Sequence, residues 1–362
     1  MSARKISVLS LPSYHWYMSK FNDGKLIYFV NPNSDFFTRS NIPTDGIKEE
    51  PTVSYLDKNF PRSSYDLVHI HFEYRNIKIT QLKELLQYFK RIKKPIIWTV
   101  HDRRSNDDNS EDLAYEKLLF KYSDKIITLT ESCKEWVGST FGLHKTVIEV
   151  LPHGYIEDPR KIKEMMKEVK KDPDLFTILY GNFRPNKEVY EIVNTFLLLS
   201  KLKNARLRLM FNPVNFYDNN ERLKIDLYNF LSSIRGEKRI EINCEPFIEH
   251  DQITRSFLES HAIILPYKWG THSGQIELAR DCGCYAVTPN VGFYREQWSK
   301  VILWEALDGK RELYPVRYAN ALIDVYKRKS FIPNPEERLR EFVDIYNKQY
   351  RIYSNCLKFH ET

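Results

Sequence analysis

Short apolar runs alternate with amphipathic stretches along most of the chain, and this alternation constrains the fold more than any other feature of the sequence. The runs are rich in Ile, Val and Leu and show no clean period of two. Such runs are typical of parallel strands that are buried on both faces of a sheet. Because helical stretches separate them, we expect parallel sheets with right-handed crossovers.

The runs form two series, which indicates two domains. The expected strands of the first series are 6–11, 26–30, 67–72, 96–100, 125–129 and 147–151. Those of the second series are 176–180, 206–211, 239–243, 262–266, 285–288 and 301–304. Helical periodicity is found at 79–92, 112–122, 189–202 and 221–234. Between the series, Pro152, Gly154, Pro159 and Pro173 surround a Lys-rich helical stretch, which we interpret as a linker.

The fold class that follows is α/β, with two Rossmann-like, doubly wound domains that face a cleft. The chain of 362 residues has the length of two ordinary domains. We place an N-terminal domain at 1–155, a linker at 156–172 and a C-terminal domain at 173–334. The last segment, 335–362, is expected to form a helix that packs back on the N-terminal domain. Ligands of such sheets bind beyond the carboxyl ends of the strands, so functional residues should directly follow strands.

Composition argues against several other classes. No segment approaches the ~20 apolar residues needed to cross a bilayer, and the N-terminus lacks the apolar core of a signal peptide. The 5 cysteines include no C-x-x-C pair, which argues against a disulfide framework or a zinc site and fits a reducing cytoplasm. The Asp-x-Asp at 172–174 precedes an expected strand instead of following one, so we expect no metal in the cleft.

The net charge of +7 is mild for this length, but the basic residues cluster at 90–94 and 161–171. A basic face can meet phosphates, nucleic acid or an anionic membrane. A solvated Lys-rich helix face is the more common reading of such a run. Because no nucleic-acid-binding module is recognisable, we expect no nucleic-acid partner, while peripheral contact with a membrane surface stays open.

The segment 261–292 holds the first candidate site. An apolar run ends at Pro266, a loop with Gly270 follows, and a helix begins near Ser273 and Gly274. Glycines let the backbone approach a ligand, and a helix start offers N–H groups and a positive dipole end, which together suit a diphosphate. Glu277, one turn further on, is placed to accept two ribose hydroxyls. The alternative is a plain strand–loop–helix connection with a surface glutamate.

The second candidate site follows the first strand of the second series. Gly181 ends that run, and Arg184 and Lys187 come three residues apart before a helical stretch. The helix dipole disfavours cations at a helix start, so a pair of them there indicates an anionic partner. Held against a diphosphate, the two cations would stabilise the departing nucleotide without a metal. The alternative is a pair of ordinary surface cations.

The third candidate site lies in the first series. His101 and His71 each close an expected strand, and Glu73 follows two residues after His71. A histidine in this place faces the cleft and is positioned to bond a sugar hydroxyl or a developing charge. A core histidine with satisfied hydrogen bonds is the alternative reading.

An aromatic-rich turn follows the first strand and lacks the G-x-G-x-x-G fingerprint, which argues against a dinucleotide-dependent redox enzyme. Its aromatic rings suggest stacking on an acceptor or a sugar, or else a core cluster. The residues of this turn that we assign to the acceptor side are Ser13, Tyr14 and His15.

In this order, the clusters resemble those of the retaining GT-B glycosyltransferases, in particular the large group 1 or family 4-like set that includes bacterial mannosyl- and glucosyltransferases. The resemblance covers most of the chain and rests on 66–71, 99–102, 181–187 and 270–283. It implies that Arg184 and Lys187 bind the donor diphosphate and that Glu277 binds the ribose. It also places His101 near the donor sugar.

One position departs from the pattern of that family. The family usually carries a second glutamate eight residues before the one matched by Glu277, and here that position is Trp269. The missing glutamate normally contacts the donor sugar, so Thr271 or His272 is the candidate to replace it. The glycine-rich turn of the first domain is also absent, which makes the acceptor side atypical.

The expected function is therefore the transfer of a hexose from a UDP- or GDP-sugar to an acceptor hydroxyl, with retention and with neither cofactor nor metal. The acceptor is a glycan, a lipid-linked compound or a small molecule, and the protein is expected in the cytoplasm, with the membrane surface as an option. Two alternatives stay open. One is a nucleotide-sugar-binding protein with altered catalysis, and the other is a nucleotide-sugar epimerase of the same fold.

Overall fold

The computed structural model describes residues 4–12, 16–30, 52–72, 77–101, 110–142, 147–181, 187–199, 202–211, 221–245, 248–305 and 314–361. The chain folds as two compact units. Unit 1 comprises Met1–Gly154 and Glu341–Thr362, and unit 2 comprises Tyr155–Arg340. Within the described residues, no helix combines the length and the apolar character that a membrane span requires.

Unit 1 contains a six-stranded parallel sheet in the order β2-β1-β3-β4-β5-β6. Its strands are β1 (Ile6–Leu11), β2 (Ile27–Phe29), β3 (Leu67–His71), β4 (Ile96–Thr99), β5 (Lys125–Thr128) and β6 (Ile148–Val150). Its helices are α1 (Trp16–Ser19), α2 (Val53–Asn59), α3 (Ile79–Arg91), α4 (Ser110–Tyr122) and α5 (Glu131–Phe141). The order of the strands reverses between β1 and β3, so the switch point lies there.

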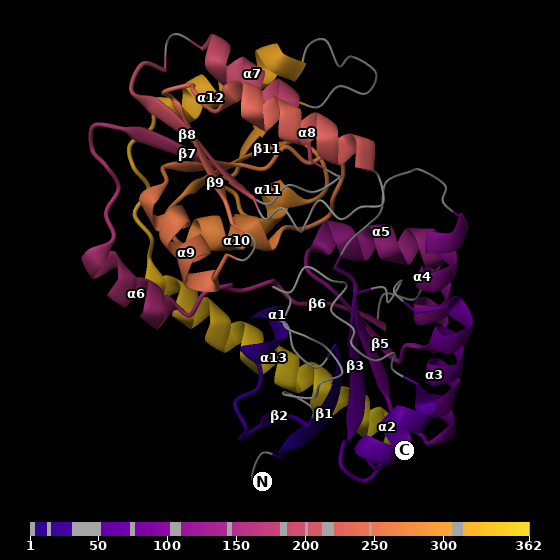
Figure 1. The fold of residues 1–362 in the computed structure, drawn as a ribbon. Coiled ribbons are helices and arrows are strands. Elements are labelled where there is room, and N and C mark those ends of the chain that lie inside the picture. Colours follow the sequence, from indigo (N-terminus) through magenta and orange to yellow (C-terminus); the bar gives the residue numbers. More distant parts are fainter. Residues whose placement is uncertain are drawn as a thin grey trace. The chain divides into compact units, whose positions relative to one another are not determined.

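Helices cover both faces of this sheet, as Figure 1 shows for α3 and α4 on one face and α13 (Pro335–Glu361) on the other. Two neighbouring residues of β4 show how helices pack on opposite faces of the sheet. Ile97 belongs to the same buried cluster as Ile352 and Tyr353 of α13. The next residue, Trp98, packs edge-on against Phe120 of α4 with ring centroids 4.7 Å apart. The expected packing of the C-terminal helix on the N-terminal domain is therefore confirmed.

Unit 2 repeats the plan with a six-stranded parallel sheet in the order β12-β11-β10-β7-β8-β9. Its strands are β7 (Phe176–Gly181), β8 (Ala205–Phe211), β9 (Ile240–Cys244), β10 (Ala262–Ile264), β11 (Tyr285–Pro289) and β12 (Ile302–Trp304). Its helices are α6 (Pro159–Glu168), α7 (Tyr190–Leu198), α8 (Glu221–Ile234), α9 (His250–Glu259), α10 (Gly274–Asp281), α11 (Tyr294–Gln297) and α12 (Tyr314–Tyr326). The strand order reverses between β7 and β10.

The segment that we interpreted as a linker packs as part of unit 2. It contains α6, whose Ile162 and Met165 are buried in the same cluster as Leu179 of β7 and Ile276 of α10. Asp158 caps this helix by accepting from the Arg160 amide at 2.8 Å. The α13 helix is shared, because it belongs to unit 2 up to Arg340 and to unit 1 from there on.

Candidate active site

The two candidate segments of unit 2 meet at the switch point of its sheet. Lys187 comes after β7, which ends at Gly181, and residues 265–277 follow β10; these two strands are paired in parallel. Beyond the strand ends, Lys187 and Tyr267 form an antiparallel bridge, and the Glu188 amide donates to the Pro266 carbonyl at 3.0 Å. Lys187 and the loop after β10 therefore lie beyond the switch point of this sheet, where doubly wound folds bind their ligands.

Helix α10 begins at Gly274, as expected, and Ser273 is its N-cap. The Ser273 Oγ accepts from the Gln275 amide at 3.2 Å and lies 2.8 Å from the Tyr267 hydroxyl. The amides of Ile276 and Glu277 donate to the Ser273 carbonyl at 3.1 and 3.4 Å. The Gly274 amide makes none of these capping bonds. We therefore regard it as the first-turn donor that could bind an anion at the positive end of the helix.

Lys187 reaches this helix start. Its Nζ donates to Oε1 of Gln275 at 2.5 Å and lies 4.8 Å from the centroid of the Tyr267 ring. The residue is only 5% exposed, so its charge is held in a fixed place instead of moving in solvent. The structure thus brings a cation to the positive end of α10, which concentrates positive potential at one point.

Gly270 has a structural role within unit 2. A Cβ at this position would collide with the Tyr294 hydroxyl, and a Cβ at Gly292 would collide with the Gly270 carbonyl. Gly292 also has a φ of 62°, in the region that side chains with a Cβ disfavour. The loop after β10 therefore lies directly against the loop after β11, and this contact accounts for both glycines without a ligand.

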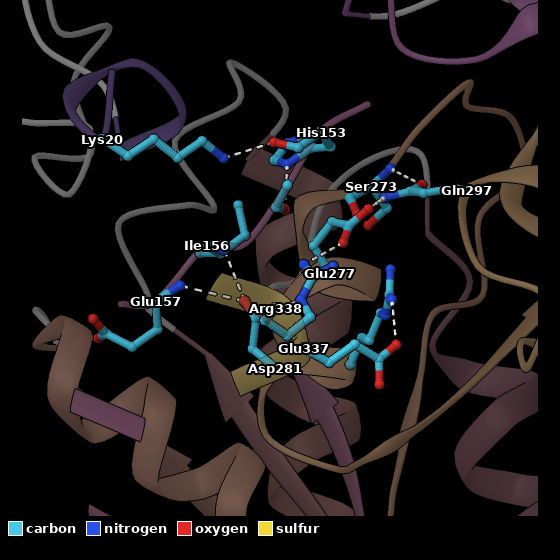
Figure 2. Close-up of polar contacts among 12 residues, drawn as sticks. Lys20, His153, Ile156, Glu157, Ser273, Glu277, Asp281, Gln297, Glu337 and Arg338 are labelled. Atoms are coloured by element: carbon cyan, nitrogen blue, oxygen red, sulfur yellow. Dashed lines mark hydrogen bonds and ion pairs between the residues drawn. The ribbon is translucent and has the colours of Figure 1, made fainter. Parts of the chain in front are cut away.

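Glu277 is buried, 3% exposed, and both carboxylate oxygens are engaged (Figure 2). Oε2 accepts from Nη2 of Arg338 at 2.7 Å, and Oε1 accepts from Nε2 of Gln297 at 3.1 Å. The same Gln297 amide donates to the Ser273 carbonyl at 2.8 Å and accepts from the Ser273 amide at 3.0 Å. Glu277 is therefore no surface glutamate, and its role toward a ribose stays a prediction.

The residues expected to replace the missing glutamate are also enclosed. Thr271 is fully buried, and its carbonyl accepts from the Phe293 amide at 3.0 Å. His272 is 8% exposed and faces the ring of Phe293 with centroids 6.0 Å apart. Both residues belong to the loop that the Gly270–Gly292 contact fixes. Trp269, which stands in place of the glutamate, is partly buried.

The third candidate site is a histidine cluster in unit 1. Nδ1 of His71 lies 3.3 Å from Nε2 of His101, and both residues are buried. The Phe72 ring stacks on His101 at 4.4 Å, and the Tyr17 ring meets His101 edge-on at 4.7 Å. Phe72 has a φ of 66°, a conformation that is rare for a residue with a side chain. The structure thus brings two predicted residues into contact at the ends of β3 and β4.

A neighbouring histidine is deeper in the core. Nδ1 of His69 lies 2.6 Å from the Tyr353 hydroxyl, and Nε2 lies 2.8 Å from Oγ1 of Thr99. Burial lowers the pKa of His69 to about 3. His69 is therefore a neutral core histidine with both ring nitrogens hydrogen-bonded, which is the alternative that we kept for strand-end histidines.

Several predicted site residues lie outside the described part of the chain. They are Arg184, Ser13, Tyr14, His15 and Glu73. Their assignments stay predictions from the sequence. Gly181 ends β7 as expected, with its backbone paired to Met210 of β8.

The two basic clusters are largely paired with groups of the protein. Lys90 bonds Asp124 at 2.6 Å, and Lys94 donates to the Tyr65 carbonyl. In α6, Lys163 bonds Glu336 at 2.6 Å and Lys161 bonds Glu157 at 3.1 Å. These contacts favour a solvated, internally paired surface over a free basic face.

Sequence reasoning missed the residues that hydrogen-bond Glu277 and pack against Gly270. Gln297 and Arg338 both bond Glu277, from positions 20 and 61 residues further along the chain. The hydroxyl of Tyr294 occupies the space beside Gly270 where a Cβ would otherwise lie. Gln297 and Tyr294 follow a predicted strand, which was a usable signal. Arg338 stands in a charged helix where nothing in the sequence distinguishes it from its neighbours.

Comparisons with known proteins agree with this architecture. Residues 39–158 match the family model Glyco_transf_4, described as Glycosyltransferase Family 4. The sequence has no match among the curated proteins.

Solved structures share the fold over most of the chain. Sucrose-phosphate synthase from Thermosynechococcus elongatus aligns with a TM-score of 0.60 and 14% identity, over 83% of this chain and 75% of that one. HepE from Anabaena, solved in complex with UDP, aligns with a TM-score of 0.58 and 13% identity, over 97% and 100%. A UDP-forming α,α-trehalose-phosphate synthase from Burkholderia vietnamiensis aligns with a TM-score of 0.55 and 13% identity, over 80% and 72%.

The paired doubly wound sheets and these alignments define the class: the chain has the GT-B fold. The match of residues 39–158 to the Glycosyltransferase Family 4 model then gives the family resemblance. Together they confirm the resemblance inferred from the sequence motifs and, with it, the expected enzyme class, a glycosyltransferase.

Proposed function

We propose that the chain transfers a hexose from a UDP- or GDP-sugar to an acceptor hydroxyl, with retention and without a metal, in glycan or glycolipid synthesis. The observation that carries the proposal is the position of Lys187, whose ammonium lies against the first turn of α10 at the switch point of the sheet. A buried cation and a helix N-terminus at one point form a site for an anion of high charge, such as a diphosphate.

The chemistry follows from where charge develops. In the transfer, the bond between the anomeric carbon and the diphosphate oxygen breaks, and the acceptor oxygen bonds that carbon as it loses its proton. Negative charge grows on the leaving diphosphate, and fixed cations and dipoles stabilise it without reorganisation. Lys187 and the start of α10 have this role in our proposal, with Arg184 added from the sequence. Retention is supported by the family resemblance alone.

The remaining roles are assigned by position. We assign the donor ribose to Glu277 and the donor sugar to His101, His272 and Thr271. UDP is supported as the nucleotide by HepE, which was solved in complex with UDP, and by the UDP-forming trehalose-phosphate synthase. The acceptor side is assigned to His71 together with Ser13, Tyr14, His15 and Glu73. A cytoplasmic location, with contact to the membrane surface as an option, completes the proposal.

A binding protein of the same fold is the second candidate. The observation that favours it is Trp269, which stands where the related family carries the sugar-contacting glutamate. Such a protein would hold a nucleotide sugar without turning it over. A nucleotide-sugar epimerase is a third candidate, and it would change the donor without an acceptor.

The test is a thermal-shift screen with UDP-, GDP-, ADP- and TDP-sugars, followed by product analysis with the sugar that binds. A ligand at a hundred times its dissociation constant adds ~2.7 kcal/mol to the native state, which gives a measurable shift. Transfer to an added hydroxyl acceptor in the presence of EDTA is the expected result. Binding without turnover across many acceptors would support the binding protein, and an altered donor without acceptor would support the epimerase. No shift with any sugar would refute the proposal.

A further inference from the structure

Arg338 lies in the first turn of α13 and joins two carboxylates of α10 (Figure 2). Its Nη2 donates to Oε2 of Glu277 at 2.7 Å, and its Nε donates to Oδ1 of Asp281 at 2.6 Å. Arg338 is 4% exposed, and the two acidic residues are 3% exposed each. All three residues belong to unit 2, so the cluster is internal to one compact unit.

The cluster needs its arginine for a physical reason. Glu277 and Asp281 are four residues apart on one helix, a spacing at which like charges repel. Buried carboxylates keep their charge only when a cation and hydrogen bonds partner them. Burial raises the pKa of Asp281, and the Arg338 guanidinium and the Ile156 amide oppose this rise. A planar guanidinium can bond both carboxylates at once, which a lysine ammonium cannot do with the same geometry.

The acidic pair also connects α10 to the segments through which the chain enters and leaves unit 2. Oδ2 of Asp281 accepts from the amides of Ile156 at 2.7 Å and Glu157 at 3.3 Å, just after unit 2 begins at Tyr155. Arg338 itself stands two residues before unit 2 ends at Arg340. One buried cluster therefore fixes α10 against both segments.

The orientation of the Glu277 carboxylate is set from two sides. Arg338 bonds Oε2, and Gln297 bonds Oε1 while it also holds both backbone groups of Ser273 at the helix start. Each carboxylate oxygen can accept two hydrogen bonds. Each oxygen therefore keeps a second acceptor direction in addition to these bonds.

We propose that Arg338 is the positioning residue of the nucleotide site: it fixes the charge and orientation of Glu277, so that this carboxylate accepts the ribose hydroxyls of a nucleoside diphosphate. The inference rests on the proposed function, because it requires a nucleotide at α10. Arg338 acts through Glu277 and not on the reacting atoms, so its loss weakens nucleotide binding more than it slows the chemical step.

The test measures binding of UDP, with GDP in parallel, to the full chain by calorimetry. Arg338→Lys keeps the positive charge but loses the planar guanidinium that bonds both carboxylates. We expect the dissociation constant of this variant for UDP to be ~10-fold higher or more than that of the wild type. In a donor-hydrolysis assay its KM for the donor should rise while kcat changes less than about threefold. Arg340→Met is the matched control, because Arg340 is an exposed arginine of the same helix, and it should bind nucleotide like the wild type.

A triple variant separates positioning from folding. Arg338→Met alone leaves two buried carboxylates without their cation and should unfold more easily. Adding Glu277→Gln and Asp281→Asn removes both charges, so stability should recover while nucleotide affinity stays as weak as in Glu277→Gln. If Arg338→Lys or the triple variant binds UDP as tightly as the wild type, Arg338 is merely structural and the inference is overturned. If the wild type and Arg340→Met bind neither UDP nor GDP, the proposed function itself fails, and the inference with it.

Discussion

Nζ of Lys187 lies 2.5 Å from Oε1 of Gln275, the second residue of α10. The two residues come from opposite sides of the switch point, one after β7 and one after β10. The contact brings a buried ammonium to the positive end of a helix, where the helix dipole attracts anions. The arrangement is therefore the strongest structural support for an anionic ligand at this place.

Replacing Lys187 with alanine should lower turnover by at least ~100-fold, because it removes a fixed charge from the leaving diphosphate. Arg184→Ala should have an effect of the same size. The measurement is kcat/KM with the donor identified by the binding screen. Lys203→Ala is the control, since Lys203 is exposed in a turn of the same unit and should leave the rate unchanged. Near-wild-type rates in both site variants would disprove the assignment.

The fold was predictable because its strands have an unusually clear signature. Each of the expected strands is present with ends that differ by at most two residues, as in 26–30 against Ile27–Phe29 and 262–266 against Ala262–Ile264. Strands buried on both faces read as continuous apolar runs, which a window of sequence can detect. The helix expected at 189–202 ends earlier, at Leu198, because the chain turns through Leu199 and Leu202 to enter β8.

The site was predictable only where its residues directly follow strands. The helix start at Ser273 and the place of Lys187 next to it were predictable in this way, because a helix start and a cation before a helix carry local signals. The two hydrogen bonds to the Glu277 carboxylate were not predictable, since they come from Arg338 of another helix and from Gln297 of another loop. Gly270 was assigned to a ligand, and the structure shows that Tyr294 also requires it. Long-range contacts of this kind leave no periodicity in the sequence.

Gly292→Ala should destabilise unit 2 by more than ~3 kcal/mol, because the new Cβ would collide with the Gly270 carbonyl at a φ of 62°. The control is Gly142→Ala, at a residue with the same φ and nothing within 4 Å of a new Cβ. It should cost only ~1–2 kcal/mol, which is the price of the left-handed conformation alone. Urea denaturation of both variants measures the loss of unfolding free energy. Equal losses would show that the two loops can move apart to accommodate the new Cβ at little cost.

Gln297→Glu should destabilise the start of α10 and weaken donor binding. The new carboxylate can still accept from the Ser273 amide. Its other oxygen, however, replaces the Gln297 nitrogen, which in the wild type donates to the Ser273 carbonyl at 2.8 Å and to Oε1 of Glu277 at 3.1 Å. Losing these bonds and placing a like charge beside the buried Glu277 carboxylate should cost at least ~2 kcal/mol. Gln87→Glu, on an exposed face of α3, is the matched control for denaturation at pH 7. If Gln297→Glu is as stable as that control, the hydrogen bonds from Gln297 to Ser273 and Glu277 do not stabilise the start of α10.

Acid should weaken unit 1 through His69. Burial lowers the pKa of this histidine from 6.5 to about 3, so the unfolded chain takes up a proton at a pH where the folded chain does not. The stabilising contribution is complete above the unfolded pKa and is lost as pH falls from 6.5 towards 3. The slope approaches ~1.4 kcal/mol per pH unit within that window.

Unfolding free energies of the wild type and His69→Gln, measured by chemical denaturation between pH 7 and 5, test this expectation. The variant should lose less stability than the wild type over that range, although it starts lower because the bonds to Tyr353 and Thr99 are altered. Part of the slope should persist, since burial also lowers the pKa of His261 in unit 2, to about 4. A slope that His69→Gln leaves unchanged would mean that the folded protein accommodates the protonated ring, because only then would both states bind the proton alike.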